Sequence, residues 1–398
     1  MFKRLIPLVA LLLPLVAACG GTTAPAATTA PAPTTVLAPT AVAAVATVPA
    51  PTAGAAGDLQ VDTSKLSKQL NLFTWTDYTS PEVLAEFEKE YGVKVIVDLY
   101  DANESRIPKI SAGNSGYDIV VPSDYAVQSM IQDKLLAPLD KTLLPNLRHI
   151  DPNNLNLYFD PGNVYSVPYF WATTGIAYNK KFFPTPPDSW SVLFDPAQLA
   201  SIKGKFTMLD DPRETPGAAL IFNGNSINDT DVNDLKQVEA LLKAQKDYVS
   251  GYDSANVNLK LATEEIVIAH AWSGMAAQAI AGIEDKPGNS NIAFVIPKEG
   301  GTIWQDNLAI VADSPNQYTA NVFINFMLRP DVAARNTDFV LYLTPNKDAR
   351  ALLAQKTRDL FATGIEPDAA TRQRLQWIER NDKTDTAFSD LWTQVRGQ

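Results

Sequence analysis

The sequence predicts an α/β protein with mostly parallel sheets, and two observations lead to this class. From residue 58 onward, apolar runs of strand length alternate with longer stretches of helical periodicity. Residues 70–100 contain these elements in the order strand, helix, strand, which is the unit that builds parallel sheets. The chain has 398 residues, of which 46% are hydrophobic. It can therefore bury a large core, which we expect to be divided between two domains.

The strand–helix–strand unit begins with a short strand at Leu72 and Phe73. Ser80 is a good N-cap, with Pro81 in the first helical position that proline favours. Apolar residues then recur at helical spacing until Gly92, which suits a left-handed helix end. Residues 93–97 are rich in β-branched side chains, so we expect a second strand there that is buried on both faces.

The rest of the chain continues this alternation without an internal repeat. A helix is expected after Ser123, and another from residue 318 to residue 328, just before Pro330. Further strands are expected at residues 117–121, 164–168, 171–178, 206–209, 266–272, 292–296 and 303–311.

The first 57 residues are expected to lie outside the globular part. Lys3 and Arg4 precede an apolar stretch, as in a signal peptide, here residues 1–18. Val16-Ala17-Ala18-Cys19 resembles a bacterial lipobox, whose cysteine becomes the acylated first residue of a lipoprotein; the alternative is an ordinary secretory signal. Residues 19–57 carry no charge and are rich in Ala, Pro and Thr, which predicts a disordered tether. We therefore expect an extracytoplasmic body anchored to a membrane through lipid on Cys19.

Charge and residue usage argue against several function classes. The net charge of −11 disfavours nucleic acid and mildly favours cationic ligands. Cys19 is the only cysteine, so the chain can form no internal disulfide. His149 and His270 have no neighbours at metal-ligand spacing, so no metal site is expected and His270 is interpreted as a core residue. Common catalytic motifs are also absent from the sequence, and we expect no enzyme.

Aromatic and acidic residues recur where the predicted strands end. Trp75, Asp77 and Tyr78 follow the first strand, at the edge where ligands of such sheets collect. Two rings beside a carboxylate suit a cationic, partly apolar ligand, although Trp75 and Tyr78 alone would more often be core residues. On a later strand, alternation places Trp304 and Asp306 on one face, and a buried carboxylate is costly without a cation. Similar groups are Ser123-Asp124-Tyr125, Asp210-Asp211-Pro212-Arg213-Glu214 and Trp272-Ser273-Gly274.

Asp211 and Glu214 have two interpretations. They can form the capping box of a helix, with Asp211 as the N-cap and Glu214 three residues later. Pro216 disfavours this because it would then be the fifth helical residue and remove a hydrogen bond. If Thr215 caps the helix instead, both carboxylates are available to a ligand. We expect the second arrangement.

These motifs, in their order and spacing, resemble the periplasmic spermidine/putrescine-binding proteins of ABC import systems. The resemblance covers nearly all of residues 68–398. It implies a two-lobe periplasmic-binding-protein fold of type II, with the ligand in the cleft between the lobes. It also implies a monomer without a cofactor that delivers its ligand to membrane permease subunits. The further motifs that carry it are Tyr117-Asp118-Ile119-Val120-Val121-Pro122-Ser123, Val167-Pro168-Tyr169, Pro297-Lys298-Glu299-Gly300-Gly301 and Leu328-Arg329-Pro330-Asp331-Val332-Ala333.

The resemblance also suggests where the lobes and the ligand contacts lie. Lobe 1 would comprise residues 58–173 and 307–349, and lobe 2 residues 174–306 and 350–398. One position departs from the family: the spermidine-specific member has a glutamine after a late tryptophan, whereas Ile378 follows Trp377 here. The choice between putrescine and spermidine therefore stays open. Carried over residue by residue, the ligand-binding residues would be Trp75, Asp77, Tyr78, Ser123, Tyr125, Asp211, Glu214, Ser254, Trp272, Trp304, Asp306 and Tyr342.

A polyamine is chemically consistent with this set of residues. Its methylene groups can lie against aromatic faces, and each terminal ammonium needs a carboxylate once water is removed. Asp211 with Glu214 could hold one end, and Asp306 or Asp77 the other. Two alternatives remain: a surface-tethered carbohydrate-active hydrolase that uses paired carboxylates, and a binding protein for another organic cation or a metal ion. The scarcity of histidine argues against the metal.

Overall fold

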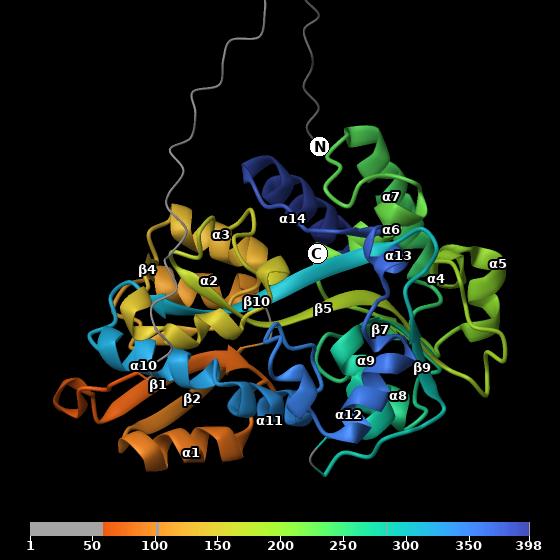
Figure 1. Cartoon of the computed structure of the whole chain (residues 1–398). Helices are drawn as coiled ribbons and strands as arrows, with labels where there is room; N and C mark the ends of the chain where they lie inside the picture. The colour runs from red at the N-terminus through yellow and green to blue at the C-terminus, as the bar shows by residue number, and fades with distance from the viewer. Residues whose placement is uncertain (1–58, 101–102, 284, 398) are drawn as a thin grey trace, which may run out of the picture. The chain divides into compact units, whose positions relative to one another are not determined.

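The computed structural model describes residues 59–100, 103–283 and 285–397, and all of them lie within the unit Ala55–Gln398 (Figure 1). The expected signal peptide, Cys19 and the tether fall outside the described residues. A sheet runs through the described part in the strand order β2-β1-β3-β10-β5-β8-β6-β7, with β4 and β11 paired to β10 and β9 paired to β5. The strands are β1 Gln69–Trp75, β2 Lys94–Tyr100, β3 Ile119–Val120, β4 Leu136–Ala137, β5 Ser166–Asn179, β6 Phe206–Met208, β7 Gly251–Tyr252, β8 Ile268–Trp272, β9 Ile292–Val295, β10 Gly301–Val311 and β11 Leu375–Gln376.

Helices cover both faces of this sheet. α1, α10 and α11 share one apolar cluster with β1, while α2 and α3 share another with its opposite face. In the same way, α6, α7 and α14 pack on one side of β6 and β8, and α8, α9 and α12 pack on the other side of β8. The helices are α1 Pro81–Tyr91, α2 Asn103–Ser111, α3 Asp124–Gln132, α4 Ser191–Phe194, α5 Pro196–Leu199, α6 Glu214–Phe222, α7 Val232–Gln245, α8 Val257–Ala262, α9 Ser273–Ala281, α10 Gln317–Met327, α11 Pro330–Val340, α12 Gln355–Leu360, α13 Ala369–Arg372 and α14 Asp382–Arg396. No helix of the described residues is long and apolar enough to cross a membrane.

The sheet is mixed, so the expectation of mostly parallel pairing is wrong. β1 is parallel to β2 and β3, and β6 is parallel to β7 and β8. In the centre, β5 and β10 are antiparallel to each other, β10 is antiparallel to β3 and β4, and β5 to β8 and β9. The parallel units predicted from the sequence are therefore present at the two sides of the sheet, and two long antiparallel strands join them (Figure 1).

β5 is one strand of 14 residues, where the sequence predicted two separate strands. The expected gap between the two strands follows Pro168, and proline cannot donate a hydrogen bond to a neighbouring strand. In the structure the pairing of β5 with β10 shifts register at this point: Asp306 is paired with Phe170, and Asn307 with Pro168. Such an irregularity accommodates the proline without ending the strand, and it can change the direction of a neighbouring side chain.

The strand–helix–strand unit is confirmed, with β1 and β2 parallel from Gln69 paired with Lys94 onward. Pro81 is the first residue of α1, and Gly92 ends it with a φ of 68°. Ser80 occupies the N-cap position, but its side chain forms no capping hydrogen bond. The expectation that the second strand is buried on both faces is wrong: Ile96 is 41% exposed. β2 is an edge strand of the sheet, so helices and neighbouring strands cover it incompletely.

β5 and β10 each pair with strands on both sides of the sheet. β5 pairs with β10 through Thr174, and from Thr174 onward with β8 and then β9. β10 pairs with β5 between Thr302 and Ala309, and its end with β3 and β4. The lobe boundaries expected from the sequence, at residues 173/174 and 306/307, fall within these two strands. The lobe boundaries themselves stay a prediction.

Candidate ligand-binding site

All twelve residues that the resemblance implied line a single pocket, a cavity of about 100 Å³. They come from positions between residues 75 and 342, and only the fold brings them together. Their contact with a ligand stays a prediction. The pocket is also lined by residues that the sequence analysis did not include in the site, namely Thr76, Tyr100, Asn103, Ala255, Asn258, Met275, Gln278 and Ile378.

Strand ends and helix beginnings position most of these side chains. Trp75, Asp77 and Tyr78 follow or end β1, and Ser123 directly precedes α3. Tyr100 ends β2, so the same strand-end signal could have identified it. Asn258 and Gln278 lie on helices α8 and α9, where a side chain that faces a ligand cannot be distinguished by sequence from one that faces a neighbouring helix.

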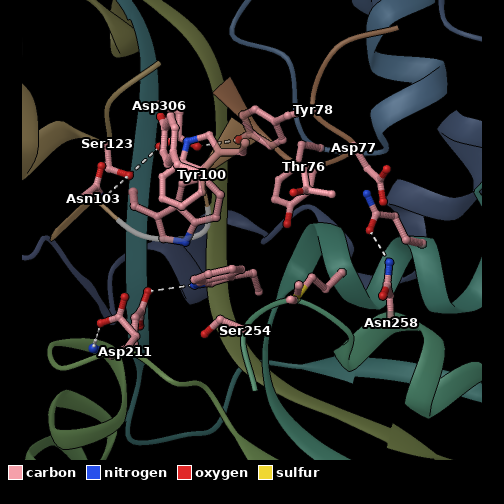
Figure 2. Close-up of a pocket in the computed structure, with 18 of the residues that line it drawn as sticks. Thr76, Asp77, Tyr78, Tyr100, Asn103, Ser123, Asp211, Ser254, Asn258 and Asp306 are labelled. Atoms are coloured by element: carbon pink, nitrogen blue, oxygen red, sulfur yellow. Dashed lines mark hydrogen bonds between the residues drawn. The ribbon is translucent and has the colours of Figure 1, made fainter. Parts of the chain in front are cut away.

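Asp306 lies in one part of the pocket and is only 3% exposed. Its two oxygens accept hydrogen bonds from the hydroxyl of Tyr78 and from Ser123 Oγ, both at 2.6 Å. Asn103 donates from Nδ2 to Ser123 Oγ at 3.1 Å and to the hydroxyl of Tyr125 at 2.7 Å (Figure 2). Burial and the nearby Asp306 carboxylate raise the pKa of Tyr78 well above its usual value. The tyrosine therefore stays a hydrogen-bond donor to the carboxylate.

Glu214 lies in a second part of the pocket and is also buried. Its Oε1 accepts hydrogen bonds from Thr174 Oγ1 at 2.8 Å and from Trp272 Nε1 at 3.2 Å, and its Oε2 accepts one from Thr302 Oγ1 at 2.7 Å. Burial, followed by the repulsion of Asp211, raises the pKa of Glu214 to about 7, whereas the three donors lower it. A cation placed here would complete the stabilisation of the ionised form.

Arg213 occupies the N-cap position of α6, so the expectation that Thr215 would cap the helix is wrong. Asp211 Oδ1 accepts hydrogen bonds from the backbone N–H groups of Arg213, at 2.7 Å, and Glu214, at 2.8 Å. Thr215 Oγ1 instead donates to the carbonyl oxygen of Leu209 at 2.7 Å. The helix begins at Glu214, so Pro216 lies in its first turn, where a missing N–H removes no intrahelical bond. Asp211 nevertheless lines the pocket.

Asp77 lines a third part of the pocket (Figure 2). Its φ of 53° places it in the left-handed region, which aspartate tolerates better than most residues. Its Oδ2 lies 2.5 Å from Lys286 Nζ. The sequence analysis treated Asp77 as an alternative to Asp306 for holding an ammonium group, whereas here a lysine of the protein takes that place.

Aromatic rings form the walls between these carboxylates. The ring centroids of Trp272 and Trp304 are 6.2 Å apart with planes at 76°, and those of Trp304 and Tyr342 are 5.8 Å apart. Tyr78 and Tyr342 make an edge-to-face contact at 5.1 Å. Such a lining offers ring faces to an apolar chain and to cations.

Comparison with known proteins identifies the family. Residues 82–363 match the family described as bacterial extracellular solute-binding protein. The chain belongs to this family. The solute-binding protein is 36% identical to the putrescine/cadaverine-binding protein of Pseudomonas aeruginosa, over 83% of this chain and 94% of the relative. It is 35% identical to the putrescine-binding periplasmic protein PotF of Escherichia coli, over 86% of this chain and 96% of the relative.

Solved structures show the same relationship. The solute-binding protein superposes with a TM-score of 0.77 on a putative spermidine/putrescine ABC transporter protein from Listeria monocytogenes, at 36% identity and over 83% of this chain and 99% of the other. The substrate-binding protein PotD of Streptococcus pneumoniae gives a TM-score of 0.70 at 34% identity, over 83% and 99% of the two chains. The fold is thus that of type II periplasmic binding proteins, and the matched family and these relatives are solute-binding proteins rather than enzymes. The hydrolase alternative is not favoured.

Two further residues, Ile378 and His270, were singled out in the sequence. Ile378 lines the pocket, where Tyr158 donates a hydrogen bond to its carbonyl oxygen at 2.8 Å. The side chain after Trp377 is therefore an apolar pocket residue, whereas the spermidine-specific family member has a glutamine after its late tryptophan. His270 is 1% exposed, and burial lowers its pKa to about 3. The interpretation of His270 as a core residue is confirmed.

Proposed function

We propose that this solute-binding protein captures a polyamine, putrescine or spermidine, in the described pocket and delivers it to the permease of an ABC transporter. The observation that carries the proposal is the placement of two buried carboxylates, Glu214 and Asp306, at separate parts of one aromatic pocket. The relatives named above as binding putrescine, cadaverine or spermidine support the same ligand class.

Strand β10 gives an approximate spacing between the two carboxylates. Glu214 is hydrogen-bonded to Thr302, and Asp306 lies four residues further along the same strand. Alternate residues of a strand share a face, and each residue advances about 3.3 Å, so the two positions are roughly 13 Å apart. Trp304 lies midway on the same face and lines the pocket. A short chain with a cation at each end matches this arrangement.

The energetic terms favour a flexible diamine or triamine over a sugar or an anion. Each methylene group that is buried against the rings contributes about 0.8 kcal/mol. An ammonium group over an aromatic face adds about 0.5–2 kcal/mol when it is desolvated. An anion would meet Asp211, Glu214 and Asp306 in a pocket from which most water is excluded, at a large electrostatic cost.

We further propose that Cys19 is acylated, that residues 19–57 tether the globular part, and that the monomeric protein works on the extracytoplasmic side of a membrane. The support is the lipobox resemblance and the uncharged composition of residues 20–57. Mass spectrometry of the protein purified from its host membrane should find a mature chain that begins at an acylated Cys19. A chain that begins elsewhere without lipid would contradict this part of the proposal.

Thermal unfolding tests the ligand class directly. A ligand that binds only the folded state raises the melting temperature by mass action. We expect millimolar putrescine, spermidine, spermine or cadaverine to raise it, and choline to have a smaller effect. If none of the four polyamines shifts the transition, the polyamine assignment is wrong. If choline shifts it most, the ligand is a different organic cation.

A further inference from the structure

A side chain of the protein already neutralises Asp77. Lys286 Nζ lies 2.5 Å from Asp77 Oδ2, although the two residues are 209 positions apart and belong to the end of β1 and the connection between α9 and β9. The side chain of Lys286 is 36% exposed and that of Asp77 23%. Asp77 lines the pocket and Lys286 does not, so the ammonium group contacts this carboxylate from outside the lining.

Two amide side chains of the same pocket, Asn258 and Gln278, also have partners within the protein. Asn258 Nδ2 donates to Gln278 Oε1 at 2.8 Å, and Gln278 Nε2 donates to the carbonyl oxygen of Val340 at 2.9 Å (Figure 2). Asn258 Oδ1 accepts a hydrogen bond from the N–H of Leu259 at 2.8 Å. The Asp77 carboxylate and the side-chain amides of Asn258 and Gln278 therefore have partners in the protein without a ligand.

Glu214 has partners of a different kind. Its three donors are the hydroxyls of Thr174 and Thr302 and the indole N–H of Trp272. These groups are neutral, so they stabilise a carboxylate without cancelling its charge. A ligand ammonium can therefore add a charge partner to Glu214, whereas at Asp77 it must first compete with Lys286.

We propose that Lys286 is a specificity-determining residue. Its ammonium group forms an ion pair with Asp77, so this carboxylate does not serve the ligand. The pair therefore disfavours polyamines with more ammonium groups than Glu214, Asp211 and Asp306 can neutralise. This inference rests on the proposed function. A diamine whose ends reach Glu214 and Asp306 leaves the Asp77–Lys286 pair intact. A longer tetraamine whose chain extends to Asp77 brings a further ammonium group next to Lys286. That like-charge approach costs binding energy and has no counterpart for the diamine.

The ion pair could instead serve only to hold two distant parts of the chain together. In that case its loss would weaken the binding of every ligand by a similar factor, because each ligand would need the same arrangement of the pocket. The two roles therefore differ in the ratio of affinities for a long and a short polyamine, and this ratio is insensitive to a uniform loss.

Calorimetric titration of the full protein with putrescine and with spermine, at one pH and one ionic strength, measures this ratio. The variants are Lys286→Met, which keeps the length of the side chain without its charge, and Lys286→Arg, which keeps the charge. Lys298→Met is the matched control, because Lys298 lies 3.8 Å from Asp188 in an exposed pair that does not line the pocket. We expect Lys286→Met to raise the affinity for spermine relative to putrescine by at least about tenfold. Lys286→Arg and Lys298→Met should keep the wild-type ratio.

If the wild-type protein binds polyamines, two outcomes would contradict the role of Lys286 and leave the proposed function intact. One is an unchanged ratio in Lys286→Met; the other is an equal loss for both ligands, which would assign the pair a structural role. If the wild-type protein binds neither polyamine, the proposed function fails as well, and the two failures are thereby distinguished.

Discussion

Glu214 and Asp77 are carboxylates of the same pocket, but they differ in how their charge is compensated. Glu214 is buried and receives hydrogen bonds from three neutral groups. Asp77 is partly exposed and pairs with the ammonium group of Lys286. The difference teaches that lining a pocket does not by itself make a carboxylate a ligand contact. A buried carboxylate among neutral donors favours an incoming cation, whereas one with a resident cation has less to gain.

The largest expected effect belongs to the buried carboxylates. Asp306→Asn should weaken polyamine binding by about 2–5 kcal/mol, because it removes one partner of a desolvated charge pair. Calorimetric titration measures the loss. Asp338→Asn is the control: Asp338 lies outside the pocket and accepts a hydrogen bond from the N–H of Ala354 at 3.0 Å. Equal losses for the two variants would place Asp306 outside the binding site.

A pH titration sharpens the role of Glu214. Burial raises its pKa to about 7 in the ligand-free protein, and a cation binds the ionised form better. Below pH 7 the ligand must displace a proton, so the affinity should fall by up to about tenfold per pH unit. Above pH 7 this dependence should disappear.

Titrations from pH 6 to pH 8 in buffers with different ionisation heats would detect the released proton. The variant Glu214→Gln carries no titratable group at this position and should bind more weakly, without the proton release that the wild type shows between pH 6 and pH 7. A wild-type affinity that is constant from pH 6 to pH 8 would mean that Glu214 is already ionised before the ligand arrives, or that it does not contact the ligand.

Asp77→Asn should have a much smaller effect on a diamine than Asp306→Asn. The carboxylate is paired and partly exposed, and such pairs contribute less than about 1 kcal/mol. Putrescine titrations of the two variants, side by side, make the comparison. A loss for Asp77→Asn as large as that for Asp306→Asn would show that the ligand displaces Lys286 and contacts Asp77 directly.

The smallest expected signal is a change of shape. Within the pocket lining, Tyr78 and Ser123 belong to the proposed lobe 1, whereas Glu214 and Trp272 belong to the proposed lobe 2. A ligand that contacts both lobes binds a closed form better, and only this differential affinity can shift the population. Small-angle scattering of a chain without residues 1–57 should show a smaller radius of gyration with saturating putrescine. An unchanged radius with binding confirmed would mean a rigid cleft.

Much of the pocket was predictable because its residues follow strands in a regular way. Trp75, Asp77 and Tyr78 were placed at the carboxyl edge of the sheet from the strand–helix–strand pattern alone, and strand alternation put Trp304 and Asp306 on one face. Asn258 and Gln278 were missed since they lie within helices, where nothing in the local pattern separates a pocket residue from an interhelical contact. The start of α6 was misjudged because a proline in the first turn is tolerated whether the helix begins at Glu214 or after Thr215.

The sequence by itself determined the strand–helix–strand unit, the position of Gly92 at a helix end, the core role of His270 and the residue types at the strand ends, because these depend on local periodicity and on side-chain chemistry. The tertiary structure alone decided that β5 continues through Pro168, that β2 lies at an exposed edge, and that Lys286 meets Asp77. Each of these depends on which segment becomes a neighbour across the sheet or across the pocket. Local pattern contains no information about a contact between residues 209 positions apart, and it is that contact which separates Asp77 from Glu214.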